Sequence, residues 1–139
     1  MAGYSGAPLA KKLGIKPGSV VYFKNVPKSV ITEIKSGEPS ATVVSRLGAN
    51  IDVALVCSTK GADLAKALDS IKPKLVQDGG LWLSWPKKSS GIATDVTETQ
   101  VREMGLASGL VDNKVCAIDD TWSGLRFVIR VKDRKANPQ

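Results

Sequence analysis

Apolar residues follow two patterns along this chain: short continuous runs, and longer stretches that are apolar on one side only. A continuous run favours a strand covered on both faces, because every side chain of such a strand lies in the core. Runs of this kind predict strands at residues 19–23, 51–57 and 81–85, and more interrupted runs predict strands at 41–47, 111–118 and 125–131. The run at 51–57 is the strongest and the run at 41–47 the weakest. The last two runs, joined by residues 119–124, predict a terminal hairpin.

Between the expected strands, apolar residues recur at the three- and four-residue spacing of one helix side. The predicted helices cover residues 5–13, 27–35, 97–108 and a stretch that Thr59 caps. Thr97 and Gln100 have the spacing of a capping box, and Gly109 is placed to end that helix. A turn is expected at residues 78–80, where two glycines precede the next strand.

Strands and helices therefore alternate along the chain until the terminal hairpin. This order predicts an α/β fold in three layers, with helices on both faces of a mostly parallel sheet that ends in an antiparallel hairpin. The chain has 139 residues, which is a usual length for one domain. We expect a single domain over residues 1–131, followed by a polar tail at 132–139.

The composition excludes several kinds of catalytic and metal site. The sequence holds no histidine, which excludes a Ser-His-Asp triad, a Cys-His pair and histidine ligands to zinc. Two cysteines, Cys57 and Cys116, are too few for a thiolate metal site, so no metal is expected. Both cysteines lie inside apolar runs, and we expect buried, unreactive thiols.

The sequence also predicts where the protein resides. No stretch is apolar enough for a signal peptide, or long enough for the roughly 20 apolar residues of a membrane span. The chain also lacks the glycine at its second position that myristoylation requires. We therefore expect a cytoplasmic protein without a membrane partner, in which both thiols stay reduced.

The net charge of +7 is distributed unevenly. Residues 1–35 carry +5, residues 36–85 are neutral and residues 86–139 carry +2. A basic surface favours anionic partners such as nucleic acid, phosphorylated metabolites or an acidic protein. Nucleic acid is the less favoured partner, because no aromatic residues interleave with the basic residues near the C-terminus. The simplest interpretation is that the lysines keep the domain soluble.

Four segments, DVALVCS, QDGGLWLSWP, SGLVDNKVCAID and GLRFVIRV, resemble the second half of a class I methyltransferase-like Rossmann domain. The resemblance implies that strands 81–85 and 111–118 are parallel and that the last strand is antiparallel. Such enzymes bind S-adenosylmethionine with a glycine-rich loop after the first strand and an acidic residue after the second. Here VVYFKNVPK has no glycine, and ATVVSRL carries Arg46 in place of the carboxylate. Neither this cofactor nor any other is therefore expected.

Three longer segments resemble an uncharacterised bacterial family known only as a domain of unknown function. They are GYSGAPLAKKLGI, GGLWLSWPKKSSGIATD and GLVDNKVCAIDDTWSGLRF, which together cover about a third of the chain. This resemblance implies a shared fold and a shared set of unusual residues, but it brings no activity with it.

The expected topology brings the loops at 86–95 and 119–124 to the edge of the sheet where ligands of open α/β folds bind. The candidate ligand-binding residues are Trp85, Lys87, Lys88, Ser89, Ser90, Asp95, Asp119, Trp122, Ser123 and Arg126. The two lysines and the arginine supply charge and the serines at 89 and 90 supply donors, while a tryptophan stacks on a flat group. The set suits a small anion with an apolar portion.

Each candidate also has an ordinary structural interpretation. Trp82 and Trp85 lie on opposite faces of one buried strand, so at least one, in our prediction Trp82, belongs to the core. Asp95 can cap the helix that follows it, and Asp119 can build the hairpin turn. As catalytic groups, Asp95 and Asp119 are the one carboxylate pair we nominate, and Lys88 can serve as the base for a serine.

Three functions follow from these residues. The favoured one is a non-catalytic binding module for a small anionic ligand, nucleotide- or phosphate-like, or for a partner protein. The first alternative is a histidine-free enzyme that acts on a phosphorylated or nucleotide-like substrate. The second alternative is a nucleic-acid accessory protein that uses the basic ends of the chain.

Overall fold

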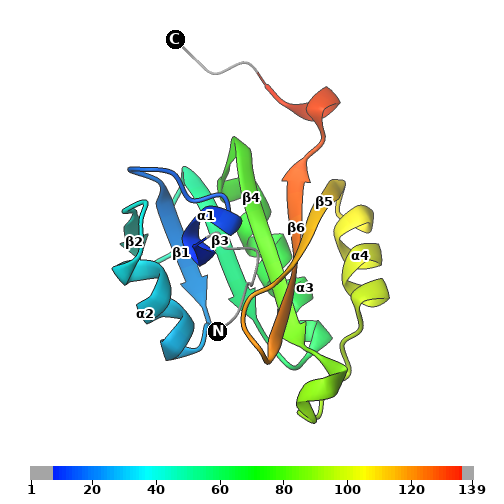
Figure 1. Cartoon of the computed structure of the whole chain (residues 1–139). Helices are drawn as coiled ribbons and strands as arrows, with labels where there is room; N and C mark the ends of the chain where they lie inside the picture. The colour runs from blue at the N-terminus through cyan, green and yellow to red at the C-terminus, as the bar shows by residue number, and fades with distance from the viewer. Residues whose placement is uncertain (1–7, 136–139) are drawn as a thin grey trace.

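In the computed structural model, which describes residues 8–135, six strands form one sheet in the order β2-β1-β3-β4-β6-β5 (Figure 1). The strands are β1 Val20–Lys24, β2 Thr42–Val44, β3 Ile51–Cys57, β4 Leu75–Pro86, β5 Leu110–Ala117 and β6 Trp122–Ile129. Strands β1 to β4 run parallel, whereas β6 runs antiparallel to both of its neighbours, β4 and β5. This arrangement confirms the predicted α/β fold with a mostly parallel sheet and a terminal antiparallel hairpin.

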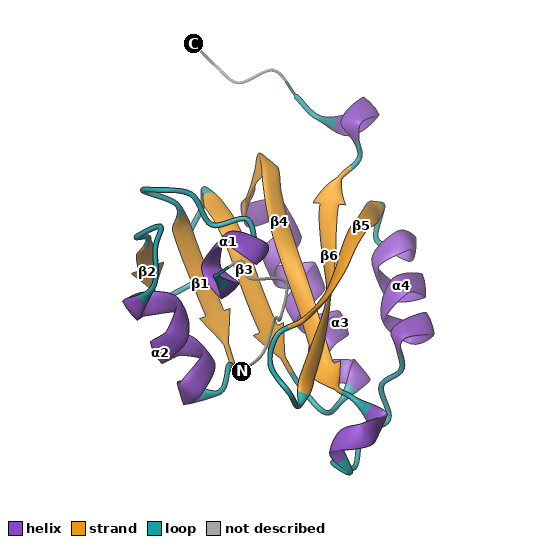
Figure 2. Ribbon diagram, in the orientation of Figure 1, coloured by secondary structure: helices purple, strands orange, loops and turns teal. Residues whose placement is uncertain are grey.

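The helices of the described residues cover both faces of this sheet (Figure 2). The α-helices are α1 Leu9–Lys12, α2 Lys28–Ser36, α3 Gly61–Ile71 and α4 Glu98–Ala107, and the 3-10 turns are η1 Lys72–Lys74, η2 Lys88–Ser90 and η3 Val131–Asp133. Helices α1 and α2 contribute to one buried apolar cluster, and α3 and α4 contribute to the other. The sheet is therefore the middle of three layers, as the pattern predicts.

The central strands β3 and β4 are apolar on both faces because each face lies under a helix layer. Leu55 and Trp82 pack on the side of α1 and α2, whereas Val56 and Leu83 pack on the side of α3 and α4. Trp82 is fully buried, and its indole N–H donates to the carbonyl of Leu13 at 3.0 Å. Trp82 therefore belongs to the core, as predicted, and it ties the segment after α1 to the sheet.

The start of helix α4 follows the predicted capping box. The Gln100 backbone N–H donates to the Thr97 hydroxyl at 3.2 Å, and the Thr97 N–H donates to the Gln100 side-chain oxygen at 3.1 Å. Gly109, with φ +97°, stands where the chain leaves the helix for β5. Local sequence is thus sufficient to place both ends of α4.

The turn predicted at residues 78–80 is wrong, because β4 is continuous from Leu75 to Pro86. Its pairing with β3 shifts there: Ile51 lies opposite Leu75, but Val53 lies opposite Gly80. The extra residues of β4 form a bulge, and a side chain at Gly79 would press on the carbonyl oxygens of Ile51 and Asp52. The glycines therefore permit close backbone approach inside a strand.

Two further local predictions are wrong. Trp122 does not lie in the hairpin turn but begins β6, opposite Pro86 of β4. Thr59 does not cap α3: its N-cap is Lys60, which makes no side-chain capping bond. Instead the Gly61 N–H donates to the Asp95 carboxylate at 2.8 Å. This partner is 34 residues away in the sequence, so local spacing cannot reveal it.

The chain ends partly coincide with expectation. Helix α1 begins at Leu9 after Pro8, and the predicted start at Ser5 lies outside the described residues. The predicted tail begins with the 3-10 turn η3, and the part from residue 136 onward also lies outside them. Within residues 8–135, no helix is long and apolar enough to cross a bilayer.

Candidate functional site

The two loops predicted to form the site do meet at one edge of the sheet. The Lys87 N–H donates to the Thr121 carbonyl at 2.8 Å, which joins the loop after β4 to the β5–β6 connection. Within the first loop, the Ser90 hydroxyl donates to the Lys87 carbonyl at 2.6 Å. Lys88 and Ser89 are exposed in the 3-10 turn η2. The two loops therefore meet at this edge. The Lys88 side chain is exposed there, and the backbone of Lys87 is held by a hydrogen bond.

The tryptophans of the predicted site lie on opposite faces of the sheet. Trp85 is only 6% exposed and packs in the cluster under α3 and α4. Trp122 is half-buried and packs against the cluster under α1 and α2. The two rings therefore cannot contact the same ligand.

The carboxylates of the predicted site are bound to backbone groups. One Asp119 oxygen accepts the N–H groups of Thr121 and Trp122, at 2.8 and 2.7 Å. Asp95 accepts the Gly61 N–H as described above. Asp119 therefore builds the hairpin turn, as its ordinary interpretation predicts, whereas Asp95 binds the start of α3 and not the helix that follows it.

Three predicted residues lie on β6: Trp122 and Ser123 at its start beside the loops, and Arg126 farther along the strand. Ser123 pairs with Trp85, and its carbonyl accepts the Ser84 hydroxyl at 2.7 Å. Arg126 pairs with Trp82, four residues before the end of β4, and its guanidinium packs on Gly80 still farther from the edge. The structure does not bring Arg126 to the loop edge.

Of the predicted site residues, Trp85 and Lys88 line a common hollow. This loop hollow has a volume of about 300 Å³ and is completed by Pro86, Val96, Thr97, Glu98 and Thr99. Glu98 adds negative charge there and pairs with Arg102 at 3.0 Å. The loop hollow is thus less suited to an anion than the lysines alone imply.

Cys57 is buried, as predicted, whereas Cys116 is only half-buried. Burial raises the pKa of the Cys57 thiol to about 12, although a hydrogen bond with Ser84 opposes the shift. Burial also raises the pKa of Cys116, against the opposing effect of the nearby Lys12 and Lys114 charges. Because the thiolate is the nucleophile, these shifts agree with the prediction of unreactive thiols.

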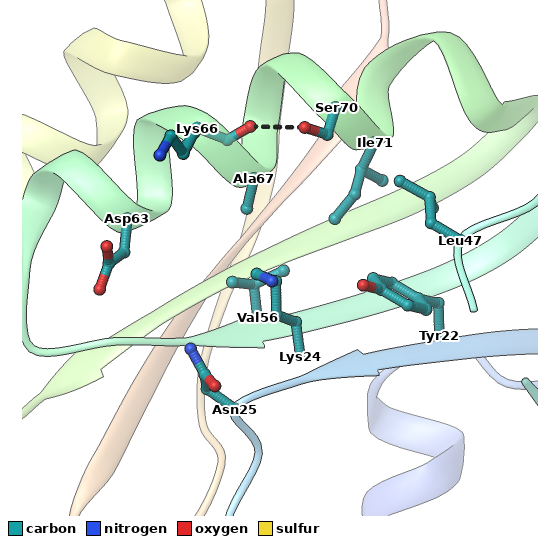
Figure 3. A pocket seen from close by; sticks show the side chains of 10 residues that line it. All are labelled: Tyr22, Lys24, Asn25, Leu47, Val56, Asp63, Lys66, Ala67, Ser70 and Ile71. Atoms are coloured by element: carbon teal, nitrogen blue, oxygen red, sulfur yellow. Dashed lines mark hydrogen bonds between the residues drawn. The ribbon is translucent and has the colours of Figure 1, made fainter. Parts of the chain in front are cut away.

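A larger pocket lies at the carboxyl ends of β1 and β3, between the sheet and α3 (Figure 3). This β1–α3 pocket has a volume of about 460 Å³ and is lined by Tyr22, Lys24, Asn25, Leu47, Val56, Asp63, Lys66, Ala67, Ser70 and Ile71. Strand β1 has β2 on one side and β3 on the other, so the chain order reverses here. Ligands of open α/β sheets bind at such a switch point.

The β1–α3 pocket combines positive charge with apolar surface. Lys24 at the end of β1 and Lys66 of α3 supply two ammonium groups. Tyr22 extends from β1 toward α3 and presents an aromatic ring with a polar tip (Figure 3). The one carboxylate, Asp63, accepts the Ser58 hydroxyl at 2.9 Å. The pocket can therefore take an anion whose body is partly apolar.

Sequence reasoning missed this pocket, although part of its signal was present. Strand alternation places Tyr22 and Lys24 on one face of β1. Helical spacing places Asp63, Lys66 and Ser70 along one side of α3. What the sequence does not show is that these two sides face one another, because that depends on how α3 lies over the sheet.

The residues after β1 and β2 do not fit S-adenosylmethionine. The connection from β1 to α2 is only Asn25, Val26 and Pro27, with no glycine to let a cofactor approach the backbone. Strand β2 ends at Val44 and is followed by Ser45 and the exposed Arg46, neither of which has a carboxylate to bind a ribose. Within residues 8–135 there is also no group of three or more Cys, Asp or Glu side chains that could hold a metal ion.

Several solved methyltransferase structures share this fold. Precorrin-6y C5,15-methyltransferase from Geobacter metallireducens GS-15 is 11% identical with a TM-score of 0.61, and the match covers 87% of this chain and 85% of that one. A SAM-dependent methyltransferase from Aquifex aeolicus is 16% identical with a TM-score of 0.57, and the match covers 86% of each chain. At such identities the similarity establishes the fold alone.

Sequence comparison gives a family without an activity. No curated protein shows significant similarity to this chain. Residues 10–131 match the family DUF3052, described as a protein of unknown function. The match spans both the β1–α3 pocket and the loop edge, and it agrees with the resemblance drawn from the sequence segments. The chain therefore belongs to the DUF3052 family.

Proposed function

We propose that this protein is a non-catalytic binding module for a small anionic ligand, nucleotide- or phosphate-like, and that the ligand binds in the β1–α3 pocket. The observation that carries the proposal is that Lys24 and Lys66, both exposed, line one hollow at the switch point of the sheet. Charged donors placed at the carboxyl ends of parallel strands are well located to hold an anion.

The size and lining of the pocket support a metabolite rather than a single ion. Its volume of about 460 Å³ falls within the range of about 300–1,000 Å³ usual for small-molecule sites. Leu47 and Ile71 provide apolar surface, and the Tyr22 ring can lie against a base or sugar. A ligand with a phosphate at one end and a flat or apolar group at the other matches this distribution.

A binding role also agrees with the chemistry of the pocket. The sequence has no histidine, and the pocket carboxylate Asp63 is already hydrogen-bonded to Ser58. Proton transfer by this carboxylate would have to compete with that bond. Binding through lysine charges needs no such rearrangement.

Calorimetric titration tests the proposal with adenosine monophosphate, a sugar phosphate and inorganic phosphate as probes. We expect saturable binding of a phosphorylated probe, weakened roughly tenfold by Lys24→Gln and by Lys66→Gln, because each variant removes one charge-assisted contact. Lys35→Gln is the matched control, since Lys35 is exposed on α2 on the other side of the sheet. The probe should be recovered unchanged after incubation.

The same titration can contradict the proposal in two ways. Unchanged affinity in both pocket variants would exclude the β1–α3 pocket as the binding site. Affinity lost in Lys88→Gln instead would place the ligand in the loop hollow beside Trp85, where tryptophan emission should respond. Chemical conversion of the probe would show that the protein is a histidine-free enzyme and not a non-catalytic binding module.

A further inference from the structure

Two basic residues face each other across the terminal hairpin. Lys114 of β5 lies directly opposite Arg126 of β6, and such antiparallel partners project to the same face. Like charges in this position repel, and an acidic neighbour usually relieves the repulsion. Among residues 8–135, however, the ion pairs are those of Arg102 with Glu98 and Asp112. The Lys114–Arg126 pair has no described carboxylate within ion-pair distance.

Arg126 is also recessed into the sheet. Its guanidinium packs on Gly80 of β4, and any Cβ at that position would overlap the guanidinium. The guanidinium also approaches Gly14, which follows α1. A glycine at position 80 is thus required for the arginine to lie where it does.

The recessed guanidinium lacks a partner. The Arg126 Nε atom is buried and has no hydrogen-bond partner, the one such buried side-chain atom among the described residues. Leaving a buried donor unpaired destabilises the folded state, more so where the group is charged. Burial lowers the pKa of Arg126, and the nearby Arg134 lowers it further, while Asp78 opposes both. The arrangement is therefore unfavourable unless something binds to it.

Further cations surround the recessed arginine and are held by backbone groups. The Lys114 ammonium donates to the Lys12 carbonyl at 3.0 Å, and the Arg134 Nε donates to the Ile129 carbonyl at 3.1 Å. These bonds fix two long side chains near Arg126 without neutralising either. The positive charge is thus positioned, as it is in sites built for anions.

We propose that Arg126, with Lys114 and Arg134, binds a phosphate-type oxyanion on the α1 side of the sheet. This site is distinct from the β1–α3 pocket, because Arg126 pairs with Trp82, whose ring packs under α1. A guanidinium presents donors in a planar fork that matches an oxyanion, and Nε is one of those donors. Because the guanidinium packs against Gly14 and Gly80, it suits contact with a single terminal phosphate better than contact with the continuous backbone of a nucleic acid.

Titration of the full chain with inorganic phosphate at constant ionic strength tests the site, with the Arg126 Nε–H signal followed by nuclear magnetic resonance. We expect a saturable shift of this signal, and Arg126→Lys identifies it by its loss. Affinity should fall several-fold in Lys114→Gln, because one charge of the pair is removed. Lys132→Gln is the control, since Lys132 is exposed in η3.

The outcomes separate this site from the proposed function. Lys24→Gln should leave the Arg126 response unchanged, so either site can fail alone. A linear response shared by all arginine signals, or no response in the unaltered protein, would overturn the proposal whether or not any variant folds. Binding of a ten-nucleotide single strand without binding of phosphate would also overturn it, in favour of a nucleic-acid surface.

Discussion

Gly105 of α4 and Phe127 of β6 lie in contact where helix α4 packs on the sheet. Phe127 is fully buried, and a Cβ at position 105 would overlap its ring. A glycine in mid-helix ordinarily weakens the helix by about 1 kcal/mol relative to alanine. Here the close approach of the ring requires that glycine, so helix propensity and packing oppose each other at one residue.

We predict that Gly105→Ala destabilises the protein, although alanine is the better helix former. Overpacking a core site typically costs about 1–3 kcal/mol, which outweighs the propensity gain. Chemical denaturation measures the difference. The double variant Gly105→Ala with Phe127→Leu should lose less stability than the two single variants together, because leucine leaves room for the added methyl. A single variant more stable than the parent would contradict the prediction.

Cys57 gives the stability a pH dependence that can be isolated. Its pKa is about 12 in the folded protein, above the ordinary value of 9.0 that applies when the chain unfolds. Between these values the unfolded chain has released the proton and the folded chain has kept it, so stability falls as the pH rises from about 9 to about 12. Each pKa unit of difference corresponds to about 1.4 kcal/mol.

The measurement compares the free energy of unfolding of the parent with that of Cys57→Ala across this range. All other titratable groups are common to both proteins, so their contributions cancel in the difference. We expect the stability advantage of the parent to shrink with rising pH. Parallel curves would show that Cys57 ionises equally in both states.

At the scale of elements, the sequence predicts best those features that depend only on residues within one segment. Six of the seven residues at 51–57 are apolar because β3 is covered on both faces, and the capping box of α4 lies within four residues. The two glycines of β4 predict a turn but form a bulge, because glycine pairs are found in turns and in bulges alike. The sequence also predicts that the two loops meet at one edge. It does not predict the position of Arg126 away from that edge, because this position depends on the register between β4 and β6.

The start of α3 shows the same limit in a form that can be tested. The N-cap residue of α3 provides no side-chain cap for the first N–H groups of the helix. Instead, the Gly61 N–H donates to the Asp95 carboxylate, which lies in the loop before α4. We predict that Asp95→Ala costs about 1 kcal/mol, the usual contribution of a helix-start acceptor, and that hydrogen exchange accelerates in the first turn of α3. Asp69→Ala is the control, since Asp69 is exposed near the other end of α3. Equal exchange in parent and Asp95→Ala would contradict the capping role.

At the scale of the whole molecule, the protein has an excess of positive charge, and its described residues form few ion pairs. The chain carries +7, and the two ion pairs among residues 8–135 share Arg102. Net repulsion of this kind destabilises the compact state and is screened by salt. The β1–α3 pocket and the Arg126 cluster lie on opposite faces of the sheet, so both faces carry positive charge that no described carboxylate neutralises within ion-pair distance.

Salt should therefore stabilise this protein, and phosphate should stabilise it more than chloride. We expect sodium chloride to raise the free energy of unfolding by on the order of 1 kcal/mol through screening alone. Phosphate at equal ionic strength adds the binding contribution, roughly 1.4 kcal/mol at ten times the dissociation constant. Because phosphate also stabilises proteins generally by exclusion from their surface, Arg126→Lys in the same buffer is the reference. A phosphate gain of the same size in Arg126→Lys would show that the excess charge of this molecule is diffuse and that no oxyanion site exists on the hairpin.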